Sequence, residues 1–196
     1  LSSHTHALVR SVMFGWCIAL AVLVLFAWCE SIARRLRRLS ELCVYDSKTG
    51  LLSGHVFEGE AWPSALREQR PLALLFLDLD GLKERNARLG HRAGDEYLQR
   101  AAKALLRRRG TDQTFRLHSA GDEFAILVLG DSAAKAADFA AVLCDDLLQL
   151  GISASIGVAW TNSNDHLSRA AVYERSERAM RSAKQRKGCV VVANDH

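Results

Sequence analysis

The chain has 196 residues, of which 49% are apolar and 24% are charged. This composition excludes a disordered protein and predicts one globular domain of ordinary size with a short appendage. The net charge of +4 is small, and much of the positive excess lies in two arginine groups at 34–38 and 107–109. A general nucleic-acid-binding surface is therefore not expected. The five cysteines are scattered without a Cys-x-x-Cys pair, which argues against a zinc site or a disulfide framework.

The first feature along the chain is an apolar run. Val12–Cys29 contains 18 uncharged residues, about the length that a helix needs to cross the ~30 Å hydrocarbon core of a membrane. Trp16 and Trp28 lie near its ends, where indole rings favour the membrane interface. We therefore predict a transmembrane helix over 12–29, preceded by an extracytoplasmic tail at 1–11. A buried soluble helix and a signal peptide are the alternatives, but no small-residue cleavage motif follows the run.

A basic segment comes directly after the apolar run. By the positive-inside rule, the arginines between Arg34 and Arg38 place the C-terminal part of the chain in the cytoplasm. Apolar residues at three- and four-residue spacing predict a helical linker over 30–45 that pairs with a second copy as a dimer stalk. An arginine-rich helix lying on anionic lipid is the alternative. The apolar residues of this seam are Ile32, Leu36, Leu39 and Cys43.

A polar turn at 46–51 marks the start of the globular domain, which we expect to extend over 46–196. The apolar pattern predicts helices at 54–69, 82–89, 93–108, 133–150 and 167–187. It predicts strands at 72–77, 114–118, 123–129, 152–160 and 190–193, the second and third of which form a hairpin. The order of these elements indicates an α/β (α+β) fold, in which a palm-like, ferredoxin-type sheet is flanked by helices.

Carboxylates gather at two strand ends of this predicted sheet. Asp78 and Asp80 follow the buried strand, and Asp122 with Glu123 occupies a small-residue turn of the hairpin. Either pair alone would be expected to be solvated at the surface. Together, carboxylates that meet at strand ends indicate a site for magnesium and phosphate.

The globular part resembles the GGDEF family of diguanylate cyclases from Tyr45 to the C-terminus. Six segments carry the resemblance in the family's order. They are Asp-Ser-Lys-Thr-Gly-Leu at 46–51 (in the family Asp-x-Leu-Thr-Gly-Leu), Leu-Asp-Leu-Asp-Gly-Leu-Lys at 77–83, Gly-His-Arg-Ala-Gly-Asp at 90–95, Ala-Gly-Asp-Glu-Phe at 120–124, Ser-Ile-Gly-Val-Ala at 155–159 and Ala-Lys at 183–184. The departures are Ser53-Gly54-His55 for Asn-Arg-Arg, Ala120 for the first signature glycine, a longer hairpin turn, and Gly188 near the place of an arginine.

The resemblance implies an enzyme that joins two GTP molecules into cyclic di-GMP, each 3′-hydroxyl attacking the α-phosphate of the other nucleotide. It implies Mg²⁺, or Mn²⁺ in its place, held by Asp78, Asp122 and the carbonyl of Leu79. Glu123 either completes the metal site or helps to deprotonate the 3′-hydroxyl. Asp122, Glu123 and Lys83 are the implied catalytic residues. Because each subunit would hold one GTP, the active enzyme is expected to be a homodimer.

The resemblance also assigns the residues that bind the substrate. Lys83 and Lys184 address the phosphates of GTP, and Gly121 lets the backbone of its turn approach them. Asn86 and Asp95 match the pair that recognises guanine. A carboxylate can accept hydrogen bonds from N1 and from the N2 amine, which adenine does not offer in this arrangement. Without the motif, Asp95 would equally be interpreted as a helix cap.

Arg109 and Asp112 resemble the family's Arg-x-x-Asp site for product inhibition, at which cyclic di-GMP binds. The distance from Asp112 to the signature is two residues longer than usual, so a solvated loop is the alternative.

Taken together, the sequence predicts a single-pass protein of the bacterial inner membrane whose catalytic domain makes cyclic di-GMP in the cytoplasm as a second messenger. One alternative is a catalytically degenerate GGDEF domain that binds GTP or cyclic di-GMP as a receptor or regulator, which Ala120 and the longer turn favour. Another is a related palm-fold cyclase acting on ATP, against which Asp95 argues.

Overall fold

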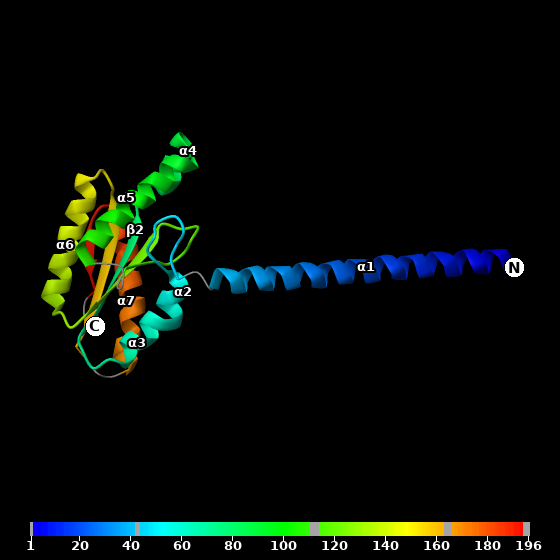
Figure 1. Cartoon of the computed structure of the whole chain (residues 1–196), viewed down its shortest axis with the longest axis horizontal. Helices are drawn as coiled ribbons and strands as arrows, with labels where there is room; N and C mark the ends of the chain where they lie inside the picture. The colour runs from blue at the N-terminus through cyan, green and yellow to red at the C-terminus, as the bar shows by residue number, and fades with distance from the viewer. Residues whose placement is uncertain (1, 42–43, 110–113, 163–165, 194–196) are drawn as a thin grey trace. The chain divides into compact units, whose positions relative to one another are not determined.

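The computed structural model describes residues 2–41, 44–109, 114–162 and 166–193. The chain divides into two compact units, Leu1–Cys43 and Val44–His196. The first unit is one helix, α1 (Ser2–Glu41), and the second is an α/β domain built on a single six-stranded sheet (Figure 1).

Helix α1 is continuous from Ser2 through the predicted membrane span and into the predicted linker as far as Glu41. By length and composition, its residues Met13–Leu36 could cross a membrane. Ile32 and Leu36 of the predicted dimer seam are 37% and 61% exposed. Of the other two seam residues, Leu39 is described by its backbone alone and Cys43 lies outside the described residues.

The α/β domain opens with short elements where the sequence predicts one helix at 54–69. Strand β1 (Leu52–Ser53) leads into α2 (Gly54–Val56), a π-helical turn η1 (Phe57–Ala61) and α3 (Trp62–Arg67). Pro63, which has no N–H to donate, lies in the first turn of α3 directly after the π-helical turn, within a helical run that is continuous over 54–67. A β-carbon on Gly54 would lie 2.0 Å from the carbonyl oxygen of Leu117, so only glycine fits at this contact.

The sheet has the strand order β1-β3-β4-β2-β5-β6. Besides β1, its strands are β2 (Leu72–Leu79), β3 (Thr114–Arg116), β4 (Glu123–Leu129), β5 (Ala154–Thr161) and β6 (Val190–Val192). Neighbours in the central run β3-β4-β2-β5 are all antiparallel, whereas β1 and β6 add to the two edges in parallel. This central arrangement is of the ferredoxin type and confirms the predicted fold class. Strand β1 was not predicted, because two residues carry no periodic pattern.

The longer helices are α4 (Leu82–Leu89), α5 (His91–Arg109), α6 (Ala133–Gln149) and α7 (His166–Lys184). The last three pack against the sheet, whereas α4 packs mainly against α5. The predicted cap of α6 is present, since the Ser132 hydroxyl oxygen accepts a hydrogen bond from the amide of Lys135. Gly90 separates α4 from α5 with a φ of 82°, a conformation that glycine adopts at little cost.

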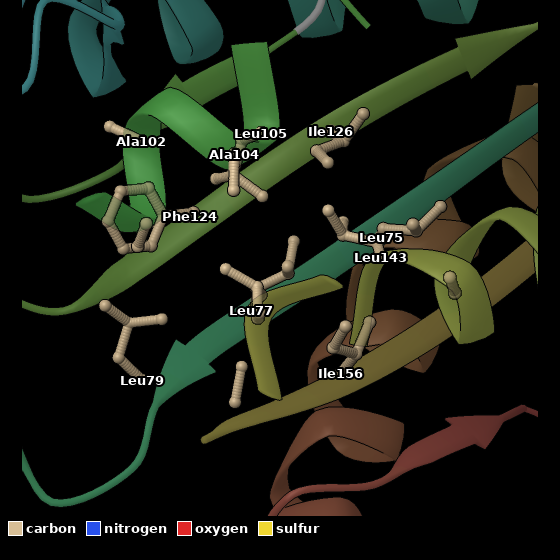
Figure 2. Packing of buried hydrophobic residues seen from close by; sticks show 14 of the residues in the cluster. Leu75, Leu77, Leu79, Ala102, Ala104, Leu105, Phe124, Ile126, Leu143 and Ile156 are labelled. Carbon is tan, nitrogen blue, oxygen red and sulfur yellow. The ribbon is translucent and has the colours of Figure 1, made fainter. Parts of the chain in front are cut away.

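The fully buried strand β2 forms the centre of the core. Its side chains alternate between the two faces of the sheet, so that Leu75 and Leu77 join one apolar cluster while Leu74 and Phe76 join the other. Helices α5 and α6 cover the first face, and α3 and α7 cover the second (Figure 1). Figure 2 shows the first cluster, in which leucines of β2 face side chains of α5 and α6.

Helix α7 approaches β5 closely enough to exclude any side chain at Gly157. A β-carbon there would lie 2.2 Å from both the amide nitrogen of Met180 and the carbonyl oxygen of Ser176. These are backbone atoms of a packed helix, so the contact could be relieved only by moving α7 away from the sheet.

We predict that Gly157→Ala lowers the free energy of unfolding by about 3 kcal/mol, because the added methyl group overpacks the interface between α7 and β5. Urea unfolding followed by circular dichroism would measure it. Gly59→Ala is the matched control, since a β-carbon at Gly59 would lie no closer than 4.0 Å to the His55 ring. Equal stability of the two variants would contradict the close approach.

Candidate functional site

A pocket of about 460 Å³ lies between α4, the start of α5 and the turn that joins β3 to β4. Its volume is in the range of small-molecule sites. It brings together Lys83 and Asn86, which lie one turn apart on α4, with Asp122 of the signature turn. The complete lining is Leu82, Lys83, Asn86, Ala87, His91, Ala120 and Asp122.

Asp78 lies beside this pocket because of the register between two central strands. Asp78 on β2 pairs with Glu123 on β4, and the amide of Leu79 donates to the carbonyl oxygen of Asp122 at 3.2 Å. The two predicted acidic segments, 44 residues apart at Asp78 and Asp122, therefore meet at one end of the sheet.

The carboxylate of Asp78 is buried with only one of its two oxygens hydrogen-bonded. Oδ2 accepts from Nζ of Lys184 at 2.7 Å, whereas Oδ1 is buried without a hydrogen-bond partner. The pKa of Asp78 is raised to about 6: burial is the largest cause, the negative charges of Asp122 and Glu123 act in the same direction, and the Lys184 ammonium acts against them. Burial acts to lower the pKa of Lys184, but the hydrogen bond to Asp78 and the nearby carboxylate charges together outweigh it, and the net shift of the pKa is upward.

These residues suit a hard divalent cation. Asp78 offers a buried oxygen that lacks a donor, and the charge of Asp122 is close enough to disfavour ionisation of Asp78. A cation would relieve both effects. Within the described ranges, no three acidic, histidine or cysteine side chains form a metal cluster. This donor set suits Mg²⁺, which is commonly held by one or two carboxylates together with water and substrate phosphate oxygens.

The residues predicted to recognise guanine are adjacent. Asn86 on α4 rests on Gly94 of α5, where a β-carbon would lie 1.8 Å from the Asn86 Oδ1 atom. Asp95 follows Gly94, and its Oδ1 accepts from Nζ of Lys48 at 2.7 Å. Because α5 begins at His91, Asp95 lies inside the helix and does not cap it. The contact with Lys48 was not predicted, since it joins residues 47 positions apart.

A buried ion pair holds the signature turn in place. Arg116 donates from Nη1 to Asp46 Oδ1 at 2.9 Å, and the two side chains are only 1% and 5% exposed. The same guanidinium donates to the carbonyl oxygen of Gly121 at 2.8 Å. Arg116 thus connects the polar turn at 46–51 with the turn that carries Asp122. The sequence analysis did not assign this role to either residue of the pair.

Asp80 is a structural residue, although it follows the same strand as Asp78. Its Oδ2 accepts from the Ser153 hydroxyl at 2.6 Å and from the Gly188 amide at 2.9 Å, and its Oδ1 accepts from the Ser155 hydroxyl at 2.8 Å. With its oxygens satisfied in this way, Asp80 fastens the end of β2 to β5 and to the turn after α7.

The chain matches the family "Diguanylate cyclase, GGDEF domain" over residues 43–189. It therefore belongs to the GGDEF family. It is 30% identical over 167 residues to the diguanylate cyclase DgcS of Shewanella oneidensis, a match that covers 78% of this chain and 53% of DgcS. It is 35% identical over 162 residues to the bifunctional diguanylate cyclase/cyclic di-GMP phosphodiesterase MucR of Pseudomonas aeruginosa, covering 72% of this chain and 23% of MucR. The chain thus spans about half, or less, of these relatives.

Solved GGDEF structures share the fold. The GGDEF domain of TpbB (YfiN) from Pseudomonas aeruginosa matches with a TM-score of 0.67 and 32% identity, over 76% of this chain and 94% of that one. The coiled coil and GGDEF domain of DgcB from Caulobacter crescentus, in complex with c-di-GMP, gives a TM-score of 0.69 over 85% of this chain and 94% of that one. At 23% identity the DgcB match shows the fold alone.

The remaining predicted GGDEF residues have the following places. Lys83 is exposed on α4, and Glu123 begins β4 with an oxygen 3.4 Å from Nε2 of His118. His91 lines the pocket as an exposed residue. Asp112 lies outside the described residues and Arg109 is described by its backbone alone, so the inhibitory site stays a prediction.

We predict that Arg116→Met lowers the free energy of unfolding by about 3 to 5 kcal/mol, because it leaves the buried charge of Asp46 without a partner. In the double variant with Asp46→Leu the buried charge is also removed, so the second substitution should cost less in that background than alone. Chemical denaturation of both single variants and the double variant measures this coupling energy. Strictly additive losses would contradict a buried pair.

A second prediction concerns metal-free protein. Between the ordinary pKa of 3.8 and the native value of about 6, the native state binds more protons at Asp78 than the unfolded state, so Asp78 lowers stability as pH rises through this window. Asp78→Asn removes that loss. From pH 5 to pH 7.5 the variant should gain on the order of 1 kcal/mol relative to the unmodified protein.

Urea unfolding in the presence of a chelator would measure this gain at the two pH values. Asp138→Asn, at an exposed position on α6, is the matched control and should show no pH-dependent difference. A stability difference for Asp78→Asn that stays constant with pH would contradict the raised pKa.

Proposed function

We propose that this protein is a diguanylate cyclase that condenses two GTP molecules into cyclic di-GMP. In each half-reaction a 3′-oxygen forms a bond to the α-phosphorus of the other nucleotide, the bond to the bridging oxygen breaks, and diphosphate leaves with its electron pair. The proton of the 3′-hydroxyl goes to a base. Two such steps close the ring and release two diphosphates.

One observation carries the proposal: a single pocket is lined by Lys83, Asn86 and Asp122. These residues offer a cation for phosphate, an amide for a base edge and a carboxylate for a metal ion. Two of them lie on α4 and the third lies on the signature turn, and a nucleoside triphosphate with its metal ion requires these three kinds of group together.

The residues at the strand ends support the chemical step. Asp78 and Asp122 would hold Mg²⁺ together with the carbonyl of Leu79. Bound Mg²⁺ would favour ionisation of the attacking hydroxyl and neutralise charge on the triphosphate. Glu123, in register with Asp78 on the neighbouring strand, is placed to accept the proton from the 3′-hydroxyl or to complete the metal site.

Binding and orientation of the nucleotide fall to residues on the helices and the signature turn. Lys83 on α4 and Lys184 on α7 supply positive charge for the phosphates. Gly121 carries no side chain beside them. Asp95 and Asn86 bind the guanine edge, because a carboxylate accepts from N1 and N2 and the amide donates to a ring or exocyclic acceptor.

The rest of the proposal concerns assembly and location. The described part of the chain would hold one nucleotide in this pocket, so two chains would have to face each other for the 3′-hydroxyls to attack. The exposed Ile32 and Leu36 of α1 would contribute to the pairing. Residues 12–29 would cross the bacterial inner membrane once, with the basic residues that follow Cys29 on the cytoplasmic side.

We predict that the full chain in detergent, incubated with Mg²⁺ and labelled GTP, forms cyclic di-GMP. Asp122→Asn should lower the rate by at least about 1,000-fold, because the amide cannot replace a charged metal ligand. Chromatography of the labelled products measures both. Asp138→Asn is the matched control, an exposed aspartate on α6 away from the pocket.

The outcomes separate the alternatives. A folded, dimeric sample that binds GTP without forming product would support a degenerate GGDEF domain, for which Ala120 in the signature is the specific reason. A cyclic product from labelled ATP would indicate a different nucleotide specificity. Undiminished turnover in Asp122→Asn would contradict the proposed metal site.

A further inference from the structure

Lys48 occupies a position at which the sequence departs from the family motif. The motif has leucine as its third residue, in Asp-x-Leu-Thr-Gly-Leu, and this chain has Asp46-Ser-Lys-Thr-Gly-Leu51. The ammonium of Lys48 donates to Oδ1 of Asp95 at 2.7 Å. A lysine at this motif position therefore contacts the residue that is proposed to bind guanine.

The backbone that carries Lys48 is fixed on both sides. The amide of Asp46 donates to the carbonyl oxygen of Leu51 at 2.7 Å, and the amide of Thr49 donates to the Asp46 carboxylate at 2.9 Å. Leu51 is fully buried, and Asp46 is anchored by Arg116. The turn thus holds Lys48 beside Asp95 without relying on their ion pair alone.

The pair is open to a ligand. The side chains of Lys48 and Asp95 are 46% and 38% exposed, so their contact costs little to rearrange and both groups can bind a third partner. Asp95 follows Gly94, against which Asn86 rests, and Asn86 lines the pocket. Lys48, Asp95 and Asn86 therefore form one continuous set of polar groups beside the pocket.

The order of donors and acceptors in this set matches guanine. Around its edge guanine presents an acceptor at O6, donors at N1 and N2, and an acceptor at N3. Asp95 can take the two donors, and Asn86 can donate to only one of the two acceptors, which lie at opposite ends. The Lys48 ammonium has three donors and no acceptor, and it can supply the other end. Adenine would present an amine to Lys48 instead.

We propose that Lys48 is a base-specificity residue of the nucleotide site, and that its ammonium donates to O6 of guanine beside Asp95. The proposal rests on the proposed GTP site. Lys48 would then select for an acceptor at position six of the purine, because a paired polar group disfavours a ligand that cannot replace its hydrogen bond.

Nucleotide binding tests the proposal without turnover. Calorimetry of the full chain in detergent with Mg²⁺ would use 3′-deoxy triphosphates, which lack the attacking hydroxyl. The probes are the guanosine, inosine and 2-aminopurine riboside forms. Guanine and hypoxanthine both carry O6, whereas 2-aminopurine lacks it. Lys48→Met should weaken binding of the first two by roughly tenfold and leave the third within about twofold.

Two further variants guard against an indirect effect. Lys103→Met removes a charge from an exposed position on α5, the helix of Asp95, and should change none of the three affinities. Lys48→Arg keeps a cationic donor and should retain most of the binding of the guanosine form. A thermal unfolding curve of Lys48→Met that matches the unmodified protein shows that the fold is intact.

Three results would overturn the proposal. An equal loss for all three nucleotides would mean that Lys48 acts on the phosphates or through general charge. Tighter binding in Lys48→Met would mean that Lys48 competes with the base for Asp95. No change would exclude a contact. If the unmodified protein binds the guanosine form but makes no cyclic di-GMP, the proposed activity fails while the specificity of the site is still measured.

Discussion

The geometry of the proposed nucleotide site depends on the buried ion pair between Arg116 and Asp46. One guanidinium satisfies the carboxylate of the turn at 46–51 and the carbonyl of Gly121 in the signature turn. The first turn positions Lys48 and the second positions Asp122. Removing either partner would leave a charge in the core, so the pair fixes two loops to each other as firmly as packing does. Loops that carry function need such anchoring, since they contribute little apolar burial themselves.

Asp78 and Asp80, at the end of β2, differ in how many of their carboxylate oxygens are hydrogen-bonded. The oxygens of Asp80 accept hydrogen bonds from two serine hydroxyls and a backbone amide, so it serves as a joint between β2, β5 and the turn after α7. Asp78 is equally buried but keeps an oxygen without a donor and has a raised pKa. A buried carboxylate oxygen without a hydrogen-bond donor is available to coordinate a cation. This distinguishes a candidate binding residue from a structural one.

The sequence predicted most of the fold, because the core strands are apolar runs and the helices have clear ends. Leu72–Leu79 is buried on both faces, and Ser132 and Gly151 bound α6 as expected. Local pattern did not reveal β1, which has two residues and depends on β3 for its hydrogen bonds. The metal and base residues came from motif resemblance. The hydrogen-bond partners of these residues could not be predicted in this way, because each pair joins residues that are far apart in the sequence.

Two departures from the family pattern, Gly188 and Lys48, lie at parts of the fold whose backbone is held independently of the side chain. Lys187 adopts a φ of 59° at the end of α7, a left-handed conformation that costs a residue with a β-carbon about 1 kcal/mol. The next residue, Gly188, gives its amide to Asp80, a contact that needs no side chain. Glycine in place of the family's arginine therefore leaves the hydrogen bond to Asp80 intact and removes only a side chain that would contact phosphate. Lys48 is comparable, because it adds a side chain beside Asp95 to a turn whose backbone is already held. Changes of this kind alter what the site binds without weakening the structure that builds it.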